Sequence, residues 1–509
     1  MSGNKKIFKN TIFLYIRMAF IMLATLYISR IILQILGVVD YGIYTLIAGF
    51  VSMFAFLTST ISSGASRFFA YEIGVGNKDR LHKYFNVSIL SFSFLAVIIL
   101  LLAETIGLWF VNNKLVIPAE RLHAALILYH FAVFSFVVNM FSLPYKSMVI
   151  AHEKMDFYAY IGIAEVILNL ILVYALNVFS VDKLGFYGFL LFLLNAIITF
   201  SFYLYCRIKY EESRYYFFWD KKMFNKFFSY SFWVIVGSIS SIFRGQGLNI
   251  VLNIFFGPTI NAARGIAFQV HSAINQFVNN FYTACRPQIT KLYAAGKSKE
   301  FMQLIYSSSR ICYMLTLLFT APVFLETPSI LEFWLETVPD YTVLFTRLVL
   351  VTILIETISY PFQAAISATG NVKWYQIITG TLTILTLPIG YLFLKLGYPP
   401  ESVFYVTIAM AICAQISRLI FMRYLLGMSI LSFFKNVVTR MILLTLFTII
   451  LPLCIHCTMA PSISRLLLVA MCSFMLVALG GYYIGISKNE RDSIKSKLNN
   501  YVGKFFGKK

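Results

Sequence analysis

Apolar runs of about 20 residues recur along the whole chain, and this feature constrains its fold more than any other. A helix of that length crosses a hydrocarbon core about 30 Å thick and satisfies its own backbone hydrogen bonds there. Composition agrees, because 59% of the 509 residues are hydrophobic and only 12% are charged. The chain is therefore expected to be an all-α integral membrane protein.

Windows of high hydropathy predict 14 transmembrane helices, of which the second is the least apolar because it is rich in serine and threonine. The predicted spans are 8–35, 42–66, 84–110, 121–144, 155–178, 186–206, 227–255, 259–284, 303–325, 342–364, 373–395, 401–424, 436–457 and 463–486.

Lysine and arginine concentrate on alternate connecting segments. If the N-terminus is cytoplasmic, 28 of the 42 basic residues lie on the cytoplasmic side. The opposite side carries five, namely Lys114, Arg121, Lys183, Lys395 and Arg465. This asymmetry follows the positive-inside rule and supports an even number of helices with both termini in the cytoplasm. The net charge of +21 therefore reflects membrane orientation, and we expect no nucleic-acid partner.

The two halves of the chain share an internal repeat with concordant offsets. An offset of 217 or 220 relates Pro144, Ala151, Tyr158, Tyr174, Gly37 and Gly76 to Pro361, Ala368, Tyr375, Tyr391, Gly257 and Gly296, respectively. Because the offset covers six helices, equivalent helices keep their orientation, which indicates a parallel pseudo-two-fold repeat about the membrane normal. We expect an N-terminal six-helix lobe at 1–210, a C-terminal lobe at 211–430, and two additional helices with a basic interfacial tail at 431–509. Duplicated hydrophobic composition is the alternative explanation.

Arginine is the basic residue of the predicted spans, which contain no lysine away from an end. The nine arginines are at positions 17, 30, 67, 244, 264, 310, 347, 418 and 440. A charge at the bilayer centre costs about 2.5–3.5 kcal/mol on insertion scales, and a guanidinium group matches phosphate oxygens. The pattern therefore points to an anionic, phosphate-bearing cargo, with Arg17 and Arg244 as the deeper candidates. Arg30 and Arg67 lie nearer an interface, where snorkelling is the alternative.

The eighth predicted span carries a polar stripe. Arg264, His271, Asn275 and Asn279 fall within one arc of about 80°, which Phe268 interrupts. Such a stripe either lines a wet lumen or packs polar groups against neighbouring helices.

Two glutamates lie near the middle of the predicted spans. Glu165 and Glu356 are candidates for coupling to H⁺ or Na⁺, and pairing with a buried arginine is the alternative. The sequence contains no Walker A, HExxH or GxSxG motif, and Cys454 and Cys457 form a single C-x-x-C pair. We therefore expect neither an enzyme nor a metal or other cofactor.

Four segments carry a resemblance to a known family. They are LGVVDYGIYTLIAGF at 36–50, FFGPTINAARGIAFQV at 255–270, RPQITKLYAAGK at 286–297 and PFQAAISATGNVKWY at 361–375. On these motifs the chain resembles the bacterial Wzx-type flippases for lipid-linked oligosaccharides. Those proteins belong to the multidrug/oligosaccharidyl-lipid/polysaccharide exporter superfamily, whose fold is that of the MATE transporters.

The resemblance implies two six-helix lobes around a V-shaped cavity lined by spans one, two, seven and eight. It also implies a cargo of undecaprenyl-diphosphate-linked oligosaccharide, the repeat unit of an O-antigen, capsule or exopolysaccharide, moved between leaflets of the bacterial inner membrane by a monomer. Some relatives carry an acidic residue in the seventh span where this chain has Asn249, which weakens the case for ion coupling there.

Three rival functions stay open at this stage. A drug/cation antiporter of the same superfamily would favour an acidic, aromatic cavity, and a lipid II flippase differs only in its cargo. A membrane-embedded polysaccharide polymerase or acyltransferase would need a large outer loop, but the longest predicted outer connection has about 16 residues, too few for a folded catalytic domain.

Overall fold

The computed structural model describes most of the chain. It leaves out residues 1–2, 55–57, 59–61, 63–64, 67, 70–71, 74, 153, 180, 370–372, 488–489 and 493–509. Within the helices, the side chains of 3–19, 155, 226–242, 283–284, 286–287, 290–291 and 294 are also outside the description. Contacts within the described part divide the chain into two compact units, Met1–Gly265 and Ile266–Lys509.

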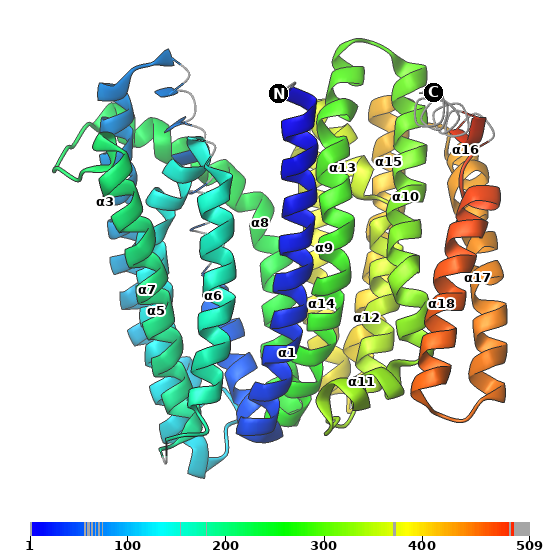
Figure 1. Cartoon of the computed structure of the whole chain (residues 1–509), viewed down its shortest axis with the longest axis horizontal. Coiled ribbons are helices and arrows are strands. Elements are labelled where there is room, and N and C mark those ends of the chain that lie inside the picture. Colours follow the sequence, from blue (N-terminus) through cyan, green and yellow to red (C-terminus); the bar gives the residue numbers. More distant parts are fainter. Residues whose placement is uncertain are drawn as a thin grey trace, which may run out of the picture. The chain divides into compact units, whose positions relative to one another are not determined.

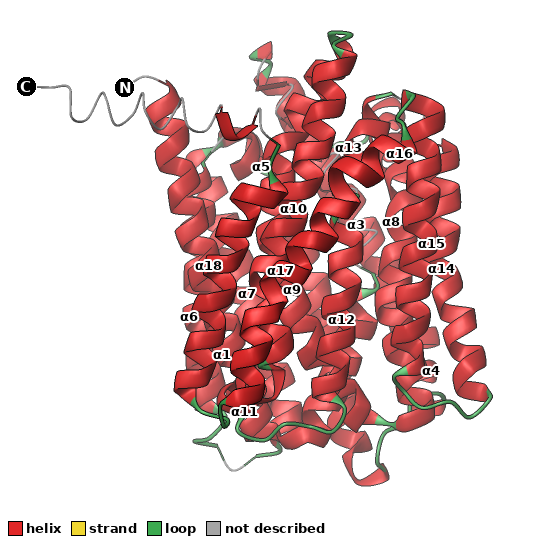
Figure 2. Cartoon of the chain, turned by 90° about the vertical axis from the view of Figure 1, so that its right-hand side faces the viewer, coloured by secondary structure: helices red, strands yellow, loops and turns green. Residues whose placement is uncertain are grey.

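The described residues form helices and connecting loops, with no strand among them (Figures 1 and 2). The first unit contains α1 (Gly3–Ser52), α3 (Lys78–Leu102), a π-turn leading into α4 (Leu108–Asn113), α5 (Leu122–Ala151), α6 (Met155–Ala175), α7 (Lys183–Lys209) and α8 (Lys221–Phe256). The start of α9 (Pro258–Ala294) also belongs to this unit.

The second unit continues from α9 into the remaining helices. These are α10 (Ser298–Leu325), α11 (Thr327–Leu335), α12 (Thr342–Thr357), α13 (Tyr360–Ala368), α14 (Lys373–Lys395), α15 (Ser402–Leu426), α16 (Ile430–Phe433), α17 (Thr439–Thr458) and α18 (Ile463–Gly480). A π-turn joins α16 to α17, and another follows α18.

Four glycines with positive φ give the repeat a structural counterpart. Gly37 interrupts α1 with φ 76° and ψ 173°, and Gly257, 220 residues later, separates α8 from α9 with φ 76° and ψ −172°. Gly76 and Gly296 form a second pair at the same offset, with φ of 75° and 68°. An L-residue with a side chain is strained in this region, so the same backbone turn explains the same residue in both halves.

Eleven helices of the described residues are long and apolar enough to cross a membrane. The difference from the predicted 14 has a local origin. The first two predicted spans lie in the single element α1, which is kinked at Gly37. The seventh and eighth fall on α8 and α9, which are not among the eleven. α9 is less apolar than those eleven because it carries the polar stripe, whereas α8 includes side chains outside the description. The predicted all-α, multi-pass membrane fold is confirmed.

Exposed apolar side chains cover the helices in the manner of a lipid-facing surface. Ile442, Leu446 and Ile450 on α17 are exposed by 55%, 56% and 62%, although each is an aliphatic residue. Inside the first unit, α5 and α7 approach closely at Gly188. A Cβ added to this glycine would lie 3.0 Å from the Cα of Leu128. Small residues of this kind let membrane helices pack backbone against backbone.

The repeat boundary predicted at 210–211 and the division at Gly265 describe different things. The first is a boundary of sequence duplication and stays a prediction. The second reflects contacts of α8 and the start of α9 with the second half of α1, where Gly42 and Gly49 leave room for Pro258 and Gln246.

Candidate functional site

A polar pocket of about 450 Å³ lies in the first unit, beside the Gly37 turn. It is lined by Tyr27, Arg30, Ile31, Gln34 and Ile35 of α1, by Tyr174 of α6, by Asn177 from the connection to α7, and by Lys183, the first residue of α7. The hydroxyl groups of Tyr27 and Tyr174 are 2.8 Å apart and join the two helices by a hydrogen bond. Arg30, predicted as a substrate-binding residue, thus lies in a pocket with a second cation.

The rim beside this pocket is fixed by an ion-pair cluster. Arg121 binds Asp40 and Asp182, with nitrogen–oxygen distances of 2.6 Å to each. Asp182 also caps α7 by accepting hydrogen bonds from the backbone of Leu184 and Gly185. Burial alone would raise the pKa of Asp182, but the bonds from Arg121 and the cap lower it below its usual 3.8. The cluster therefore holds the start of α7, and Lys183 with it, at a fixed place.

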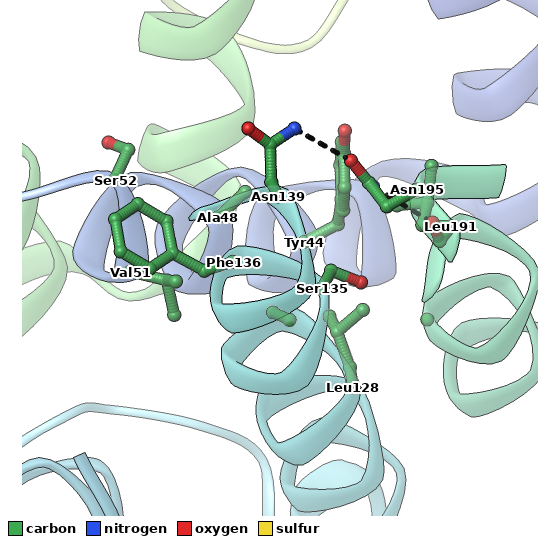
Figure 3. A pocket seen from close by; sticks show the side chains of 12 residues that line it. Tyr44, Ala48, Val51, Ser52, Leu128, Ser135, Phe136, Asn139, Leu191 and Asn195 are labelled. Carbon is green, nitrogen blue, oxygen red and sulfur yellow. Dashed lines mark hydrogen bonds between the residues drawn. The ribbon is translucent and has the colours of Figure 1, made fainter. Parts of the chain in front are cut away.

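A second pocket of about 240 Å³ lies among the second half of α1, α5 and α7 (Figure 3). Its polar groups include Asn139, whose amide donates to Asn195 at 3.1 Å, and the buried hydroxyl of Ser135. Among the described atoms that hydroxyl has no hydrogen-bond partner. Sequence reasoning missed this pocket because it contains no charged residue, and single asparagines in apolar spans give little signal.

Arg264 is buried, with 5% of its surface exposed, and one guanidinium nitrogen donates to the carbonyl of Gly245 on α8. Gly245 follows Arg244, which is half-buried, and α8 remains helical through this Arg-Gly-Gln-Gly segment. Helix α8 is therefore continuous here, and the carbonyl of Gly245 accepts a hydrogen bond from α9. The structure brings Arg264 into one region of the first unit with Arg244, because the carbonyl that it binds belongs to the residue directly after Arg244.

Buried asparagines link this region to the second half of α1. Asn261 donates to the side-chain and backbone oxygens of Asn249 at 2.8 and 2.7 Å, and Asn249 donates to the carbonyl of Thr45 at 3.4 Å. Asn253, fully buried, exchanges two hydrogen bonds with the backbone of Val116. Asn249, noted in the sequence as the place of an acidic residue in some relatives, therefore has a packing role.

The remaining stripe residues of α9 belong to the second unit. Asn279 donates to Asn275 at 3.3 Å, and the hydroxyl of Tyr360 on α13 donates to the same Asn275 oxygen at 2.8 Å. His271 contacts the ring of Phe268 with centroids 5.7 Å apart. Part of the stripe thus packs against α13, while Asn279 is exposed.

The two glutamates proposed for coupling differ in surroundings. Glu165 on α6 is exposed, and its charge acts on the half-buried Lys146 of α5. Glu356 on α12 is half-buried, and its carbonyl accepts a hydrogen bond from Ser359, which also accepts one from Arg418. Arg418 thus joins α15 to the break between α12 and α13.

Two predicted arginines fall outside the described part. Arg67 is itself left out, and Arg17 lies on α1 among side chains that the structure does not describe. The basic interfacial helix predicted for the C-terminal tail also falls outside, since description ends at residue 492.

Several charged residues are engaged by carboxylates that the sequence did not associate with them. Arg310 on α10 binds Glu490 at 2.7 Å and donates to the carbonyl of Asn436 at 3.1 Å. Arg465 and His456 bind the two oxygens of Glu326 at 2.8 and 2.7 Å. The described residues include no group of three or more His, Cys, Asp or Glu side chains placed to hold a metal ion.

Solved structures of two kinds share this fold. The chain is similar to the lipid II flippase MurJ in an inward closed conformation, with a TM-score of 0.69, 16% identity, and coverage of 93% of this chain and 98% of the other. It is also similar to a MATE family multidrug resistance transporter of the MOP superfamily. In its inward-facing conformation that transporter gives a TM-score of 0.62, 14% identity, and coverage of 82% and 95%. At these identities the likeness establishes the fold alone.

Sequence comparisons give the family. Comparison with curated proteins finds no match. A family model described as polysaccharide biosynthesis protein matches residues 7–293, which is more than half of the chain. The resemblance rests on four segments. The match includes all of two of them, 36–50 and 255–270, and most of a third, 286–297. The chain belongs to the polysaccharide biosynthesis protein family, and its fold is the one shared by MurJ and the MATE transporters.

Proposed function

We propose that this protein is a flippase that moves an undecaprenyl-diphosphate-linked oligosaccharide from the inner to the outer leaflet of a bacterial inner membrane. The observation that carries the proposal is the family match, because polysaccharide assembly on a lipid carrier requires the sugar to cross the bilayer. Without a carrier, the sugar hydroxyls and the diphosphate would enter hydrocarbon without hydrogen-bond partners, at a cost of several kcal/mol for each group.

Cationic side chains supply the chemistry for the headgroup. Arg244 and Arg264 lie together in the first unit, and each can offer guanidinium donors to phosphate oxygens. The bond from Arg264 to the carbonyl of Gly245 satisfies one donor without neutralising the charge. Arg17, Arg67 and the stripe residues His271, Asn275 and Asn279 are further candidates for headgroup binding in this proposal.

The transport cycle we propose is alternating access, in which two similar six-helix lobes rock while the lipid tail stays in the bilayer. The protein would work as a monomer with both termini in the cytoplasm, and Glu165 or Glu356 would couple the cycle to H⁺ or Na⁺. Likeness to MurJ favours lipid II as the second candidate cargo, and likeness to a MATE transporter favours a drug as the third. A membrane-embedded polymerase or acyltransferase would require catalysis, for which the sequence offers no motif.

The test is transport by purified protein in proteoliposomes. Polyprenyl-diphosphate-linked oligosaccharide should become accessible to an external probe within minutes, whereas lipid II and a cationic drug should not. Transport of the drug alone, or of lipid II alone, would contradict the proposed cargo.

Variants separate headgroup binding from folding. Arg264→Gln and Arg244→Gln should each lower the initial rate at least tenfold, which corresponds to about 1.4 kcal/mol. Arg264→Lys keeps the charge and should retain more activity than Arg264→Gln if charge is what matters. Arg347→Gln is the matched control, because Arg347 bonds the carbonyl of Phe324 in the second unit and has no assigned role in transport. Full transport by both Arg264→Gln and Arg244→Gln would remove the assignment.

A further inference from the structure

The pocket beside the Gly37 turn has the chemistry of a phosphate site. Among the described residues, its polar lining consists of two cations, Arg30 and Lys183, two amides, Gln34 and Asn177, and the hydrogen-bonded hydroxyls of Tyr27 and Tyr174, with no carboxylate. The two cations, the two amides and one hydroxyl of the Tyr27–Tyr174 pair can donate hydrogen bonds to a ligand, and a diphosphate offers acceptor oxygens. A volume of about 450 Å³ lies within the range of small-molecule sites.

The acidic groups nearest in sequence are already engaged. Asp40 and Asp182 both bind Arg121 at 2.6 Å, and neither lines the pocket. Within the described part of the chain Lys183 makes no ion pair. The described lining of the pocket therefore holds two cations and no carboxylate.

The repeat shows that the fold does not require these polar residues. At the offset of 220, Arg30 and Gln34 correspond to Ile250 and Ile254 in the other half, and at the offset of 217 Asn177 corresponds to Leu394. Tyr174 keeps its counterpart as Tyr391. The structural position thus accepts aliphatic side chains in one half and holds donors in the other.

Location adds a second argument. The pocket lies beside the kink of α1 at Gly37, between the first two predicted spans. The distribution of basic residues predicts that this kink is on the outer side of the membrane. Basic residues on that side oppose the positive-inside rule, and only five of the 42 are predicted there. Lys183 is one of them, and it lines the same pocket as Arg30.

We infer that this pocket, between α1 and α6, is a binding site for a lipid diphosphate headgroup at the outer-leaflet end of the first unit. The inference rests on the proposed function for the identity of the lipid, and it adds a release-side site distinct from Arg244 and Arg264, neither of which lines this pocket. Arg30 and Lys183 bind the phosphate oxygens, and the amides of Gln34 and Asn177 donate to the remaining acceptors. The cargo would occupy it after crossing and before it leaves the protein.

The experiment measures binding to the full chain in nanodiscs of zwitterionic lipid. The probes are polyprenyl diphosphate without sugar, inorganic pyrophosphate, and phosphatidylglycerol incorporated in the nanodisc as a competitor. Arg30→Gln/Lys183→Gln should weaken polyprenyl diphosphate binding at least tenfold and reduce the salt dependence of its Kd. The charge-conserving exchange Arg30→Lys/Lys183→Arg should stay within about threefold of the wild type. Lys114→Gln, a cation predicted on the same side that lies over the ring of Trp109, is the matched control and should change Kd less than twofold.

Each outcome decides the matter. If monodisperse Arg30→Gln/Lys183→Gln protein binds polyprenyl diphosphate with unchanged affinity, the pocket is not the headgroup site. The proposed function then still stands, provided that the wild type transports. Displacement of polyprenyl diphosphate by equal amounts of phosphatidylglycerol overturns the claim that the site recognises a diphosphate. The site would then be one for bulk anionic lipid. Binding of pyrophosphate at the same affinity supports the headgroup site and shows that the tail adds nothing. A wild type that binds but does not transport contradicts the proposed function and not the pocket.

Discussion

The cluster formed by Glu326, His456 and Arg465 should hold the C-terminal helix pair to the rest of the second unit. Glu326 follows α10, His456 lies near the end of α17, and Arg465 is near the start of α18. The Glu326 side chain is 1% exposed and that of Arg465 is 7% exposed. Arg465 also donates to the carbonyl of Met459 at 3.1 Å and to Ser329 at 3.2 Å.

Arg465→Gln should destabilise the attachment of this helix pair by about 3 kcal/mol. Breaking a buried ion pair costs roughly 3–5 kcal/mol, and the lower figure applies because His456 still binds the other oxygen of Glu326. Hydrogen exchange of α18 amides that open with the pair should therefore accelerate about 100-fold, since 1.36 kcal/mol is a factor of ten. Glu326→Gln should have a similar effect, because it leaves the guanidinium group of Arg465 buried without its carboxylate.

A double-mutant cycle tests the pairing itself. Glu326→Gln/Arg465→Gln should cost about as much as either single change, which gives a coupling of roughly 2–3 kcal/mol. Lys395→Gln is the control, because Lys395 is exposed and makes no ion pair within the described residues. Exchange within threefold of the wild type in Arg465→Gln, or strictly additive single effects, would refute this reasoning.

Three further outcomes follow from the same contacts. Burial alone would raise the pKa of Glu326, but bonds from His456 and Arg465 lower it below its usual 4.5. The stabilising contribution of Glu326 should therefore persist above pH 4.5 and disappear as the pH falls through the lowered pKa. Thermal unfolding between pH 7 and 3 measures this loss. Arg310→Gln should cost about 3 kcal/mol by leaving the carboxylate of Glu490 without its main partner, read from exchange of the α10 amides. Gly42→Ala should cost about 2 kcal/mol because its Cβ would meet the carbonyl oxygen of Pro258 at 2.0 Å, whereas Gly245→Ala, with nothing within 4 Å, should be neutral or stabilising in the same unfolding titration.

The fold was predictable from sequence because its main signals are local. Apolar runs identify membrane helices, since hydrocarbon allows few other structures, and the glycine pairs at an offset of 220 identify turns that need positive φ. The break between α12 and α13 was not predicted, although Pro361 lies there. Its repeat partner Pro144 sits inside the continuous helix α5, so proline alone does not decide whether a membrane helix breaks.

The candidate site was predictable only in part, because partners far apart in sequence decide what a charged side chain does. Arg310 and Glu490 are 180 residues apart, and Arg465 and Glu326 are 139 apart, so no pattern along the chain connects them. Lys183 looked like an ordinary loop cation until the structure placed it in the same pocket as Arg30. The pocket around Asn139 and Asn195 gave no signal, since amides in apolar spans also occur as packing groups.

The structure therefore refines the rule that an arginine in a membrane span marks an anionic cargo. Where a carboxylate is supplied, as Glu490 supplies one to Arg310, the charge is neutralised and the arginine joins helices. A hydrogen bond to a carbonyl, such as the one from Arg264 to Gly245, engages a donor but does not itself neutralise the positive charge. Neutral substitution should affect the protein differently at the two kinds of arginine. A variant of an arginine paired with a carboxylate should lose stability and keep its affinity for diphosphate. A variant of an arginine bonded to a carbonyl should lose affinity more than stability. The residue type is the same for both kinds, so the sequence alone does not distinguish them.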